Sequence, residues 1–204
     1  MDAITTVRGH AAAIHRANID TDQIISAKWM KRIERTGYED GLFAKWRTNP
    51  NFILNHPERE GVSIIIAGPN FGCGSSRQHA VWALRDYGIK AIISPSIADI
   101  HRTNLPEEGL VPVEIDQAAV DRLMKATDEN PATIIEIDLT ERTVTCETAD
   151  LLSAPFHIDS ASQYNLVNGL DPIGLTLTLE QRIAFHETKR DPWLPECGPF
   201  LTSV

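Results

Sequence analysis

A glycine-rich turn between an apolar strand and a helix is the feature that most limits how this chain can fold. Residues 62–67 form a glycine-bounded run rich in β-branched side chains, which is typical of a strand buried on both faces. The turn at 70–76 follows, and residues 77–87 then have helical spacing up to Gly88, a residue suited to ending a helix. A strand, a tight turn and a helix in this order build a parallel sheet covered by helices.

The alternation of strand and helix continues through the middle of the chain. Residues 90–94 and 110–115 predict two more strands with a helical segment between them, and Asp116 is placed to begin a further amphipathic helix. Residues 133–138 and 143–147 predict an antiparallel hairpin. The predicted fold class is therefore α/β, a mainly parallel β-sheet flanked by helices with an additional β-hairpin.

The C-terminal part has helix signals of another kind. The segments 160–163 and 178–181 have the Ser/Thr-x-x-Gln spacing of a capping box, and each predicts a helix that follows it. The last residues are rich in proline and predict irregular structure. The expected organisation is a single domain of residues 1–190, followed by an irregular C-terminal tail of residues 191–204.

Composition limits the classes of function. The chain has 204 residues, a formal net charge of -9 and a hydrophobic content of 42%, which together predict one well-cored globular domain. No Lys/Arg-rich stripe offsets the negative charge, so a nucleic-acid partner is not expected. The sequence has no charged leader before an apolar stretch and no run of about 18 apolar residues. The expectation is a cytoplasmic protein with no membrane partner.

The cysteines argue against both a disulfide framework and a metal centre. Cys73, Cys146 and Cys197 are widely separated, with no CxxC pair and no accompanying histidine pattern. A 4Fe–4S cluster normally needs cysteine ligands in close spacing. We therefore expect this chain to bind no metal and no cofactor by itself.

The glycine-rich turn has the chemistry of an anion-binding site. Gly72 and Gly74 let the backbone approach a ligand closely, and Ser75 and Ser76 lie where a helix presents unpaired amide protons. Arg77 adds a full positive charge with a planar fork that suits a carboxylate or a phosphate.

Other interpretations of the same residues stay open. Ser75 and Gln78 have capping-box spacing, so an alternative is that Ser75 only caps the helix. Cys73 is either a nucleophile activated by the helix start and Arg77, or a small residue in a tight turn. A phosphate-binding loop and a dinucleotide motif are both incomplete, because no lysine follows the glycines and Arg77 replaces the third glycine.

Two separated motifs carry a family resemblance. Residues 70–80 read Asn-Phe-Gly-Cys-Gly-Ser-Ser-Arg-Gln-His-Ala, and residues 18–25 read Asn-Ile-Asp-Thr-Asp-Gln-Ile-Ile. Together they resemble the family formed by the small subunits of 3-isopropylmalate dehydratases and the swivelling last domain of aconitases. Segments 35–38 and 82–88 match as well, and the resemblance is strong over residues 16–112.

The resemblance implies an aconitase-type swivelling domain that is active only with a large subunit. In the family that large subunit carries a 4Fe–4S cluster, whose open iron takes the substrate hydroxyl as a Lewis acid, and the substrate is a small di- or tricarboxylate. The implied activity is that of a hydro-lyase. It interconverts 2-isopropylmalate and 3-isopropylmalate by dehydration and rehydration in leucine biosynthesis.

The resemblance also implies catalytic roles for individual residues. Ser75 matches the base that removes a proton from the carbon next to a carboxylate, stabilised as an alkoxide by Arg77, backbone amides and the helix dipole. Ser76 matches a residue that holds the substrate or Ser75. Asp22 is expected near the cleft, where it orients a group of the large subunit, although a simple turn also favours acidic and hydroxyl residues at 20–23.

The polar stretch 28–38 holds a second set of candidates. It is either a solvated helix face or, as the resemblance implies, a loop that reads the side group of the substrate. In the latter case Arg35 and Thr36 are substrate-binding residues.

Departures from the family pattern leave the substrate open. Gln78 stands where the family usually has Glu, and residues 100–105 look more like aconitase than like the isopropylmalate branch. Small subunits of hydratases acting on citraconate, 2-methylmalate or dimethylmaleate share the framework. A non-catalytic carboxylate-binding module is an alternative of a different class. His79 is either a proton carrier or a residue at the helix start that packs at a subunit contact.

Overall fold

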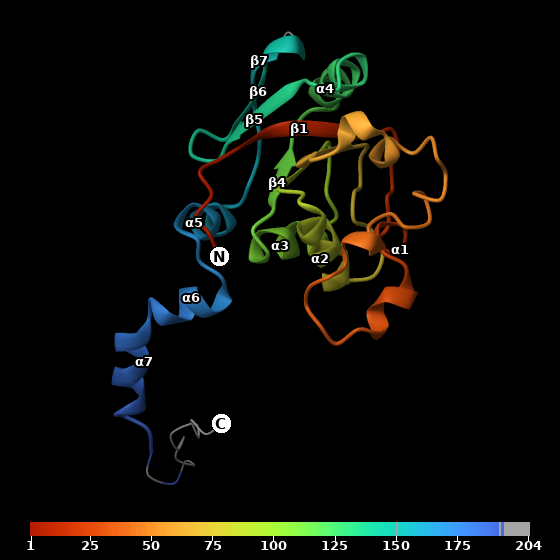
Figure 1. Ribbon diagram of the computed structural model, residues 1–204. Coiled ribbons are helices and arrows are strands. Elements are labelled where there is room, and N and C mark those ends of the chain that lie inside the picture. Colours follow the sequence, from red (N-terminus) through yellow and green to blue (C-terminus); the bar gives the residue numbers. More distant parts are fainter. Residues whose placement is uncertain (150, 192, 194–204) are drawn as a thin grey trace. The chain divides into compact units, whose positions relative to one another are not determined.

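A single mixed sheet organises the computed structural model, which describes residues 1–149, 151–191 and 193. Within these residues the sheet has seven strands in the order β4-β3-β2-β1-β5-β6-β7 (Figure 1). The strand β1 therefore lies in the middle. The strands are β1 (Thr6–Ile14), β2 (Ile64–Ala67), β3 (Ala91–Ser94), β4 (Val111–Glu114), β5 (Ile134–Asp138), β6 (Thr143–Cys146) and β7 (Leu151–Pro155).

The parallel part of the sheet contains the predicted central strands. β1 pairs with β2, β2 with β3 and β3 with β4, all in parallel. Every residue of β2 and β3 is buried, which explains why both are continuous apolar runs without alternation. β1 was not predicted from the sequence. Its segment contains Gly9, His10 and a run of alanines, which do not favour a strand.

The antiparallel part contains the predicted hairpin and one further strand. β5 pairs with β6, with Glu136 opposite Thr145. On its other side β5 pairs with β1, with Arg8 opposite Glu136, and β7 adds to β6. The predicted α/β class with a hairpin is confirmed, and the antiparallel part is larger than a hairpin alone.

Helices cover both faces of the parallel part. Ile64 and Ile66 of β2 pack in one core cluster with α4, whereas Ile65 and Ala67 pack in a second cluster with α2 and α3. Figure 1 shows α4 on one side of β1 and the pair α2 and α3 on the other. The α-helices are α1 (Thr21–Ile24), α2 (Gln78–Tyr87), α3 (Asp99–Glu107), α4 (Gln117–Glu129), α5 (Ser160–Asn168), α6 (Pro172–Leu177) and α7 (Glu180–Glu187), and the 3₁₀ helices are η1 (Ala27–Lys31), η2 (Glu39–Gly41), η3 (Ile53–Asn55), η4 (Pro57–Arg59) and η5 (Glu147–Ala149).

The helix ends agree with the predictions at some positions and differ at others. Gly88 ends α2 with a φ of 99°, and Asp116 is the N-cap of α4, both as predicted. The two predicted C-terminal capping boxes are wrong. Asp159 caps α5 by accepting two backbone N–H groups, so that helix needs no cap from Ser160. The N-cap of α7 is Leu179, which makes no side-chain hydrogen bond there.

The chain divides into two compact units, Met1–Asp171 and Pro172–Val204. The first unit holds the whole sheet and α1 to α5, and the second contains α6 and α7. This division falls before the domain boundary predicted at residue 190. The predicted tail of residues 191–204 lies outside the described residues, except for Asp191 and Trp193. In the described ranges no helix combines the length and the apolar character that crossing a membrane requires.

A buried arginine gives a test of the packing between β1 and α4. Arg59 is 3% exposed and donates to the carbonyl oxygens of Ala11, at 2.9 Å, and Thr127, at 2.7 Å. We expect Arg59→Ala to lower the free energy of unfolding by about 2–4 kcal/mol, because two buried carbonyls lose their donor. The control Arg122→Ala, at an exposed position of α4, should change it by less than about 0.5 kcal/mol. Urea unfolding measures both, and equal losses would contradict the packing role.

Candidate active site

The candidate site lies where the parallel strands end. The segments after β1 and β2 meet through a bridge between Asp20 and Cys73, and the segments after β2 and β3 meet through a bridge between Phe71 and Ile97. In open α/β sheets, ligands bind at the carboxyl ends of the parallel strands. The turn follows β2, which pairs in parallel with β1 and with β3, so the turn lies at the carboxyl ends of these strands.

The two glycines of the turn are required by its backbone. Gly72 has a φ of 74° and Gly74 a φ of 91°, in the left-handed region that favours glycine. A Cβ on Gly72 would also lie 2.3 Å from the ring of His101 in α3. The turn therefore packs directly on an imidazole that is 3% exposed.

A cavity of about 240 Å³ opens beside this turn. Its walls come from α1, from the turn and from the start of α3, which are far apart in sequence. Ser75 and Ser76 are exposed at it, so both hydroxyls are accessible to a ligand. The lining residues are Thr21, Gly72, Gly74, Ser75, Ser76, Arg77, Ala98, Asp99, Ile100, His101 and Asn104.

The structure brings together four of the six predicted site residues. Ser75, Ser76 and Arg77 line the cavity, and Nη1 of Arg77 lies 2.5 Å from Oδ1 of Asp22. The side chains of Arg77 and Asp22 are 20% and 51% exposed, so this ion pair contributes little to stability. The pair ties the guanidinium of Arg77 to α1, at the cavity that the two serines also line.

The structure decides how the helix after the turn begins. The N-cap of α2 is Arg77, and no side chain caps that helix, so the capping interpretation of Ser75 is wrong. The carbonyl of Ser75 instead accepts a hydrogen bond from Oγ1 of Thr21 at 2.9 Å. A true capping box occurs in α1, where Asp20 and Gln23 bond each other's backbone N–H. These two bonds hold the first turn of α1, which contains Asp22, in place.

The other two predicted site residues lie apart from the cavity lining. Arg35 and Thr36 are exposed in the loop after η1. The backbone carbonyl of Arg35 accepts a hydrogen bond from Arg85, which is near the end of α2 whose beginning borders the cavity. Tyr38, fully buried, fixes the end of the loop by donating its backbone N–H to Asp86 at 3.1 Å.

Residues at the start of α2 pack against neighbouring side chains. The ring of His79 lies 5.5 Å from that of Tyr38 and 4.9 Å from that of Trp82, so it packs on aromatic side chains of its own chain. Burial, and then the charge of Arg77, lower the pKa of His79. Gln78 donates to Oε1 of Glu108 at 3.0 Å.

The thiol in the turn has no sign of activation. Burial, and then the negative charge of Asp20, raise the pKa of Cys73, whereas an activated nucleophile needs a lowered one. Cys73 and Cys146 are free thiols in the turn and in β6, and Cys197 lies outside the described residues. Over the described part of the chain, no three His, Cys, Asp or Glu side chains are grouped to hold a metal. The described residues therefore do not fit an iron–sulfur cluster.

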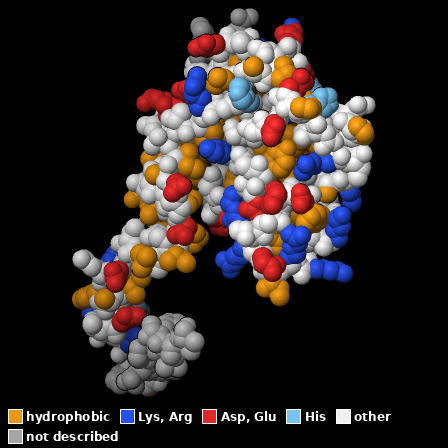
Figure 2. Space-filling view, viewed as in Figure 1, with side chains coloured by type: hydrophobic (Ala, Val, Ile, Leu, Met, Phe, Trp, Pro, Cys, Tyr) orange, Lys and Arg blue, Asp and Glu red, His pale blue; other side chains and the backbone are white. Residues whose placement is uncertain are grey.

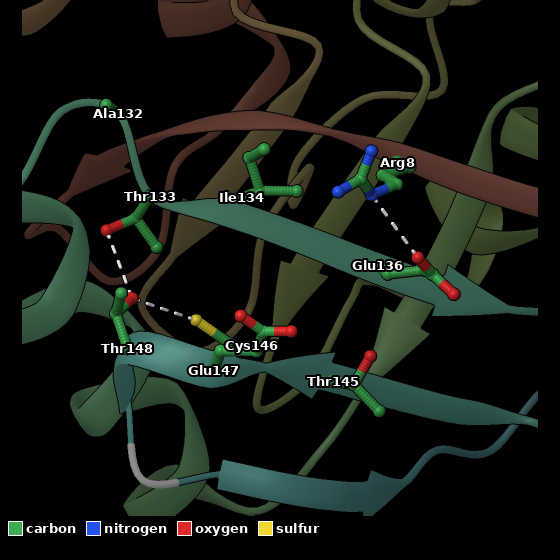
Figure 3. A pocket seen from close by; sticks show the side chains of 9 residues that line it. All are labelled: Arg8, Ala132, Thr133, Ile134, Glu136, Thr145, Cys146, Glu147 and Thr148. Atoms are coloured by element: carbon green, nitrogen blue, oxygen red, sulfur yellow. Dashed lines mark hydrogen bonds and ion pairs between the residues drawn. The ribbon is translucent and has the colours of Figure 1, made fainter.

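A second hollow, on the antiparallel part of the sheet, lacks the chemistry of the first (Figure 3). Two of its three threonine hydroxyls bond each other: Thr148 donates to Thr133 at 3.2 Å and lies 3.5 Å from Sγ of Cys146. Arg8 pairs with Glu136 at 3.4 Å. Its arginine and two of its threonines thus have partners, whereas the hydroxyls of Ser75 and Ser76 make no side-chain hydrogen bond within the described residues.

Sequence reasoning named Asp22 of α1 as a site residue but not Thr21 of α1 or the three polar residues that α3 contributes. Thr21 braces the turn, and Asp99, His101 and Asn104 line the cavity. Asp99 and Asn104 occur in a segment that follows the second predicted strand. Their position after a strand end was the one sequence signal that they could belong to the site. His101 gave no signal, because its contact with Gly72 joins residues that only the fold brings together.

The first 118 residues carry the family signature. The model of the family described as "Aconitase C-terminal domain" matches residues 1–118, which include the turn, the cavity and β1 to β4. The fold and the site thus define an aconitase-type C-terminal domain.

Relatives that match almost the whole chain identify the branch of this family to which it belongs. The 3-isopropylmalate dehydratase small subunit of Nocardioides sp. is 47% identical over 196 residues, covering 96% of this chain and 97% of the relative. That of Streptomyces coelicolor is 47% identical, with 96% and 98% covered. A crystal structure of 3-isopropylmalate dehydratase from Methanocaldococcus jannaschii is similar with a TM-score of 0.63 and 26% identity, over 91% of this chain and 99% of that one. The chain therefore belongs to the 3-isopropylmalate dehydratase small subunit family.

The histidine beneath the turn gives a test by pH. Burial lowers the pKa of His101 to about 4 from an ordinary 6.5, so between these values the unfolded chain binds a proton that the folded chain does not. The free energy of unfolding should therefore fall as the pH is lowered, with His101 contributing about 2–3 kcal/mol between pH 7 and pH 4.5.

The comparison variant His101→Phe keeps a ring against Gly72 and removes the titrating group. Denaturant unfolding at pH 7 and pH 4.5 should show a smaller loss for this variant than for the natural chain. Equal losses would contradict burial of a neutral imidazole.

Proposed function

We propose that this chain is the small subunit of a 3-isopropylmalate dehydratase. It would act as a hydro-lyase with a large subunit and interconvert 2-isopropylmalate and 3-isopropylmalate, a step of leucine biosynthesis, in the cytoplasm. The observation that carries the proposal is the cavity in which Ser75, Ser76 and Arg77 meet, with Arg77 held by Asp22. The family membership of the whole chain supports it.

Ser75 is the proposed base for the proton on the carbon next to a carboxylate. A serine hydroxyl is a weak base and needs its alkoxide stabilised. Arg77 is oriented for this by Asp22, and α2 adds the partial positive charge of its first turn. Because one bond to Asp22 leaves most of the five donors of a guanidinium unused, Arg77 can also bind a substrate carboxylate. Ser76 is the proposed second contact to the substrate.

The large subunit is proposed to carry the 4Fe–4S cluster, which supplies a Lewis acid for the hydroxyl. The described residues of this chain do not fit that cluster, so their proposed work is binding and proton transfer. Small di- or tricarboxylates are the proposed substrate class, because the site offers hydroxyls, backbone amides and a guanidinium.

Two alternatives differ from this proposal in class. A related small subunit, acting on citraconate, 2-methylmalate or dimethylmaleate, would use the same turn. A non-catalytic carboxylate-binding module would use the turn without turnover. Assays of the complex with a panel of these substrates separate all three.

The loop residues Arg35 and Thr36 are proposed to read the side group of the substrate. They are exposed and lie outside the cavity lining, so they are free to meet a substrate held between subunits. We expect Arg35→Ala and Thr36→Ala to change the ratio of kcat/KM for isopropylmalate and methylmalate. Steady-state kinetics measures this ratio, and a uniform loss for all substrates would argue for a structural role.

Ser75→Ala tests the central assignment. The hydroxyl caps no helix, so its loss should leave the free energy of unfolding within about 0.5 kcal/mol of the natural chain. If Ser75 is the base, Ser75→Ala should lower kcat by on the order of 10²-fold or more, which is the usual effect of removing a positioned proton-transfer group. The measurement is turnover by complex that is confirmed to be assembled and iron-loaded.

The matched control is Ser160→Ala, an exposed serine at the start of α5, which should leave kcat unchanged. Near-normal turnover by an intact Ser75→Ala complex would refute the catalytic role of Ser75.

A further inference from the structure

The C-terminal unit exposes a set of apolar side chains on α6, on α7 and between them. Figure 2 shows apolar side chains gathered along this segment. Soluble proteins seldom expose a contiguous apolar patch unless it serves as an interaction surface. The side chains, with their exposed fractions, are Ile173 (70%), Leu175 (39%), Leu177 (62%), Leu179 (42%), Ile183 (40%) and Phe185 (62%).

The two helices are too short to be stable by themselves. α6 has six residues and α7 has eight, and neither buries any residue in the described structure. Isolated helices shorter than about 12–15 residues are marginal in water, and most helical stability in proteins comes from packing an apolar face. These helices therefore require a surface that covers them.

The spacing of the apolar residues suits docking in a groove. Ile173 and Leu177 are four residues apart, and so are Leu179 and Ile183, so each pair can lie on one side of a helical turn. Short amphipathic helices that bind in an apolar groove use anchors with this spacing.

We infer that the segment 172–187 docks in an apolar groove on the large subunit. The inference rests on the proposed function, which supplies that partner. The alignment to the Nocardioides small subunit spans 196 of the 204 residues and 97% of that relative. It leaves eight residues of this chain unaligned, fewer than the 33 of Pro172–Val204. Most of the C-terminal unit is thus shared with a chain named as a small subunit.

Charge favours an unlike partner over a second copy of this chain. The formal net charge of -9 makes two copies repel each other. Within residues 172–187 the charged side chains are Glu180, Arg182 and Glu187, so the segment has a net charge of only -1 with His186 neutral. Docking therefore depends on apolar burial and should be insensitive to salt.

The test is a double variant of the full chain, Leu177→Gln with Phe185→Gln, which keeps good helix formers and removes two apolar anchors. The matched control is Gln181→Ala with His186→Gln, which changes exposed polar residues of α7. The probe is an iron-loaded 3-isopropylmalate dehydratase large subunit from the same source. The measurements are its Kd, the Tm and solution mass of the isolated chain, and kcat with excess large subunit.

We expect the apolar double variant to raise the Kd by about tenfold or more, as for truncation of interface anchors. The Tm and mass of the isolated chain should stay unchanged, and kcat should recover when the large subunit is in excess. The control should bind like the natural chain. If kcat recovers at high concentrations of the large subunit, the variant is impaired in binding that subunit and not in catalysis.

Three results would overturn the inference. An unchanged Kd shows that the large subunit does not use this surface. A lower Tm shows that the segment packs on its own chain, and a change from dimer to monomer shows that it packs on a second copy. If the natural chain neither binds the large subunit nor gives turnover with it, the proposed function fails as well. If the natural chain does both and the variant equals it, only the docking inference fails.

Discussion

The contact between Gly72 and the ring of His101 is the constraint on which the site depends. The φ of 74° and the position of a Cβ at 2.3 Å from the ring leave no room for another residue. Because the turn lies so close to α3, the N–H of Gly72 reaches the carbonyl of Ile19 at 2.7 Å. That bond draws the segments after β1 and β2 together, and Asp22 can then meet Arg77. A larger residue at 72 would separate the two motifs that make the site.

The fold also accounts for one departure from the family pattern. Gln78 replaces the usual Glu, and its amide donates to Glu108 at 3.0 Å. The same carboxylate accepts from Trp82 at 2.8 Å and pairs with Arg85. A glutamate at 78 would place a second carboxylate beside Glu108, and like charges this close destabilise each other. In this chain Gln78 joins the start of α2, directly after the turn, to Glu108 at the end of α3.

The parts of the fold with strong local signals were predictable from sequence. The buried strands, the turn and the helix end at Gly88 follow from β-branched runs and glycine, and the fold class followed from their order. β1 did not, because its glycine and alanines pack well only between β2 and β5. Turn chemistry predicted an anion site at residues 75–77; the structure places all three at one cavity, and their roles stay a prediction. The cap of α2 was not, because Ser75 and Gln78 have the right spacing while tertiary bonds to Thr21 and Glu108 override it.

The charge around the turn explains why this chain is suited to working with a partner. Among the described residues that line the cavity, Arg77 is the only cation, and its charge is offset by Asp22. Asp99 of the lining is offset by Arg102 at 2.9 Å. The site thus fixes one guanidinium in place but adds little net positive charge, and the whole chain carries -9. A dicarboxylate gains orientation from such a site and little electrostatic attraction. Under the proposed function, further attraction for the substrate would have to be supplied by the large subunit, because Arg77 and Asp22 offset each other's charge on this side.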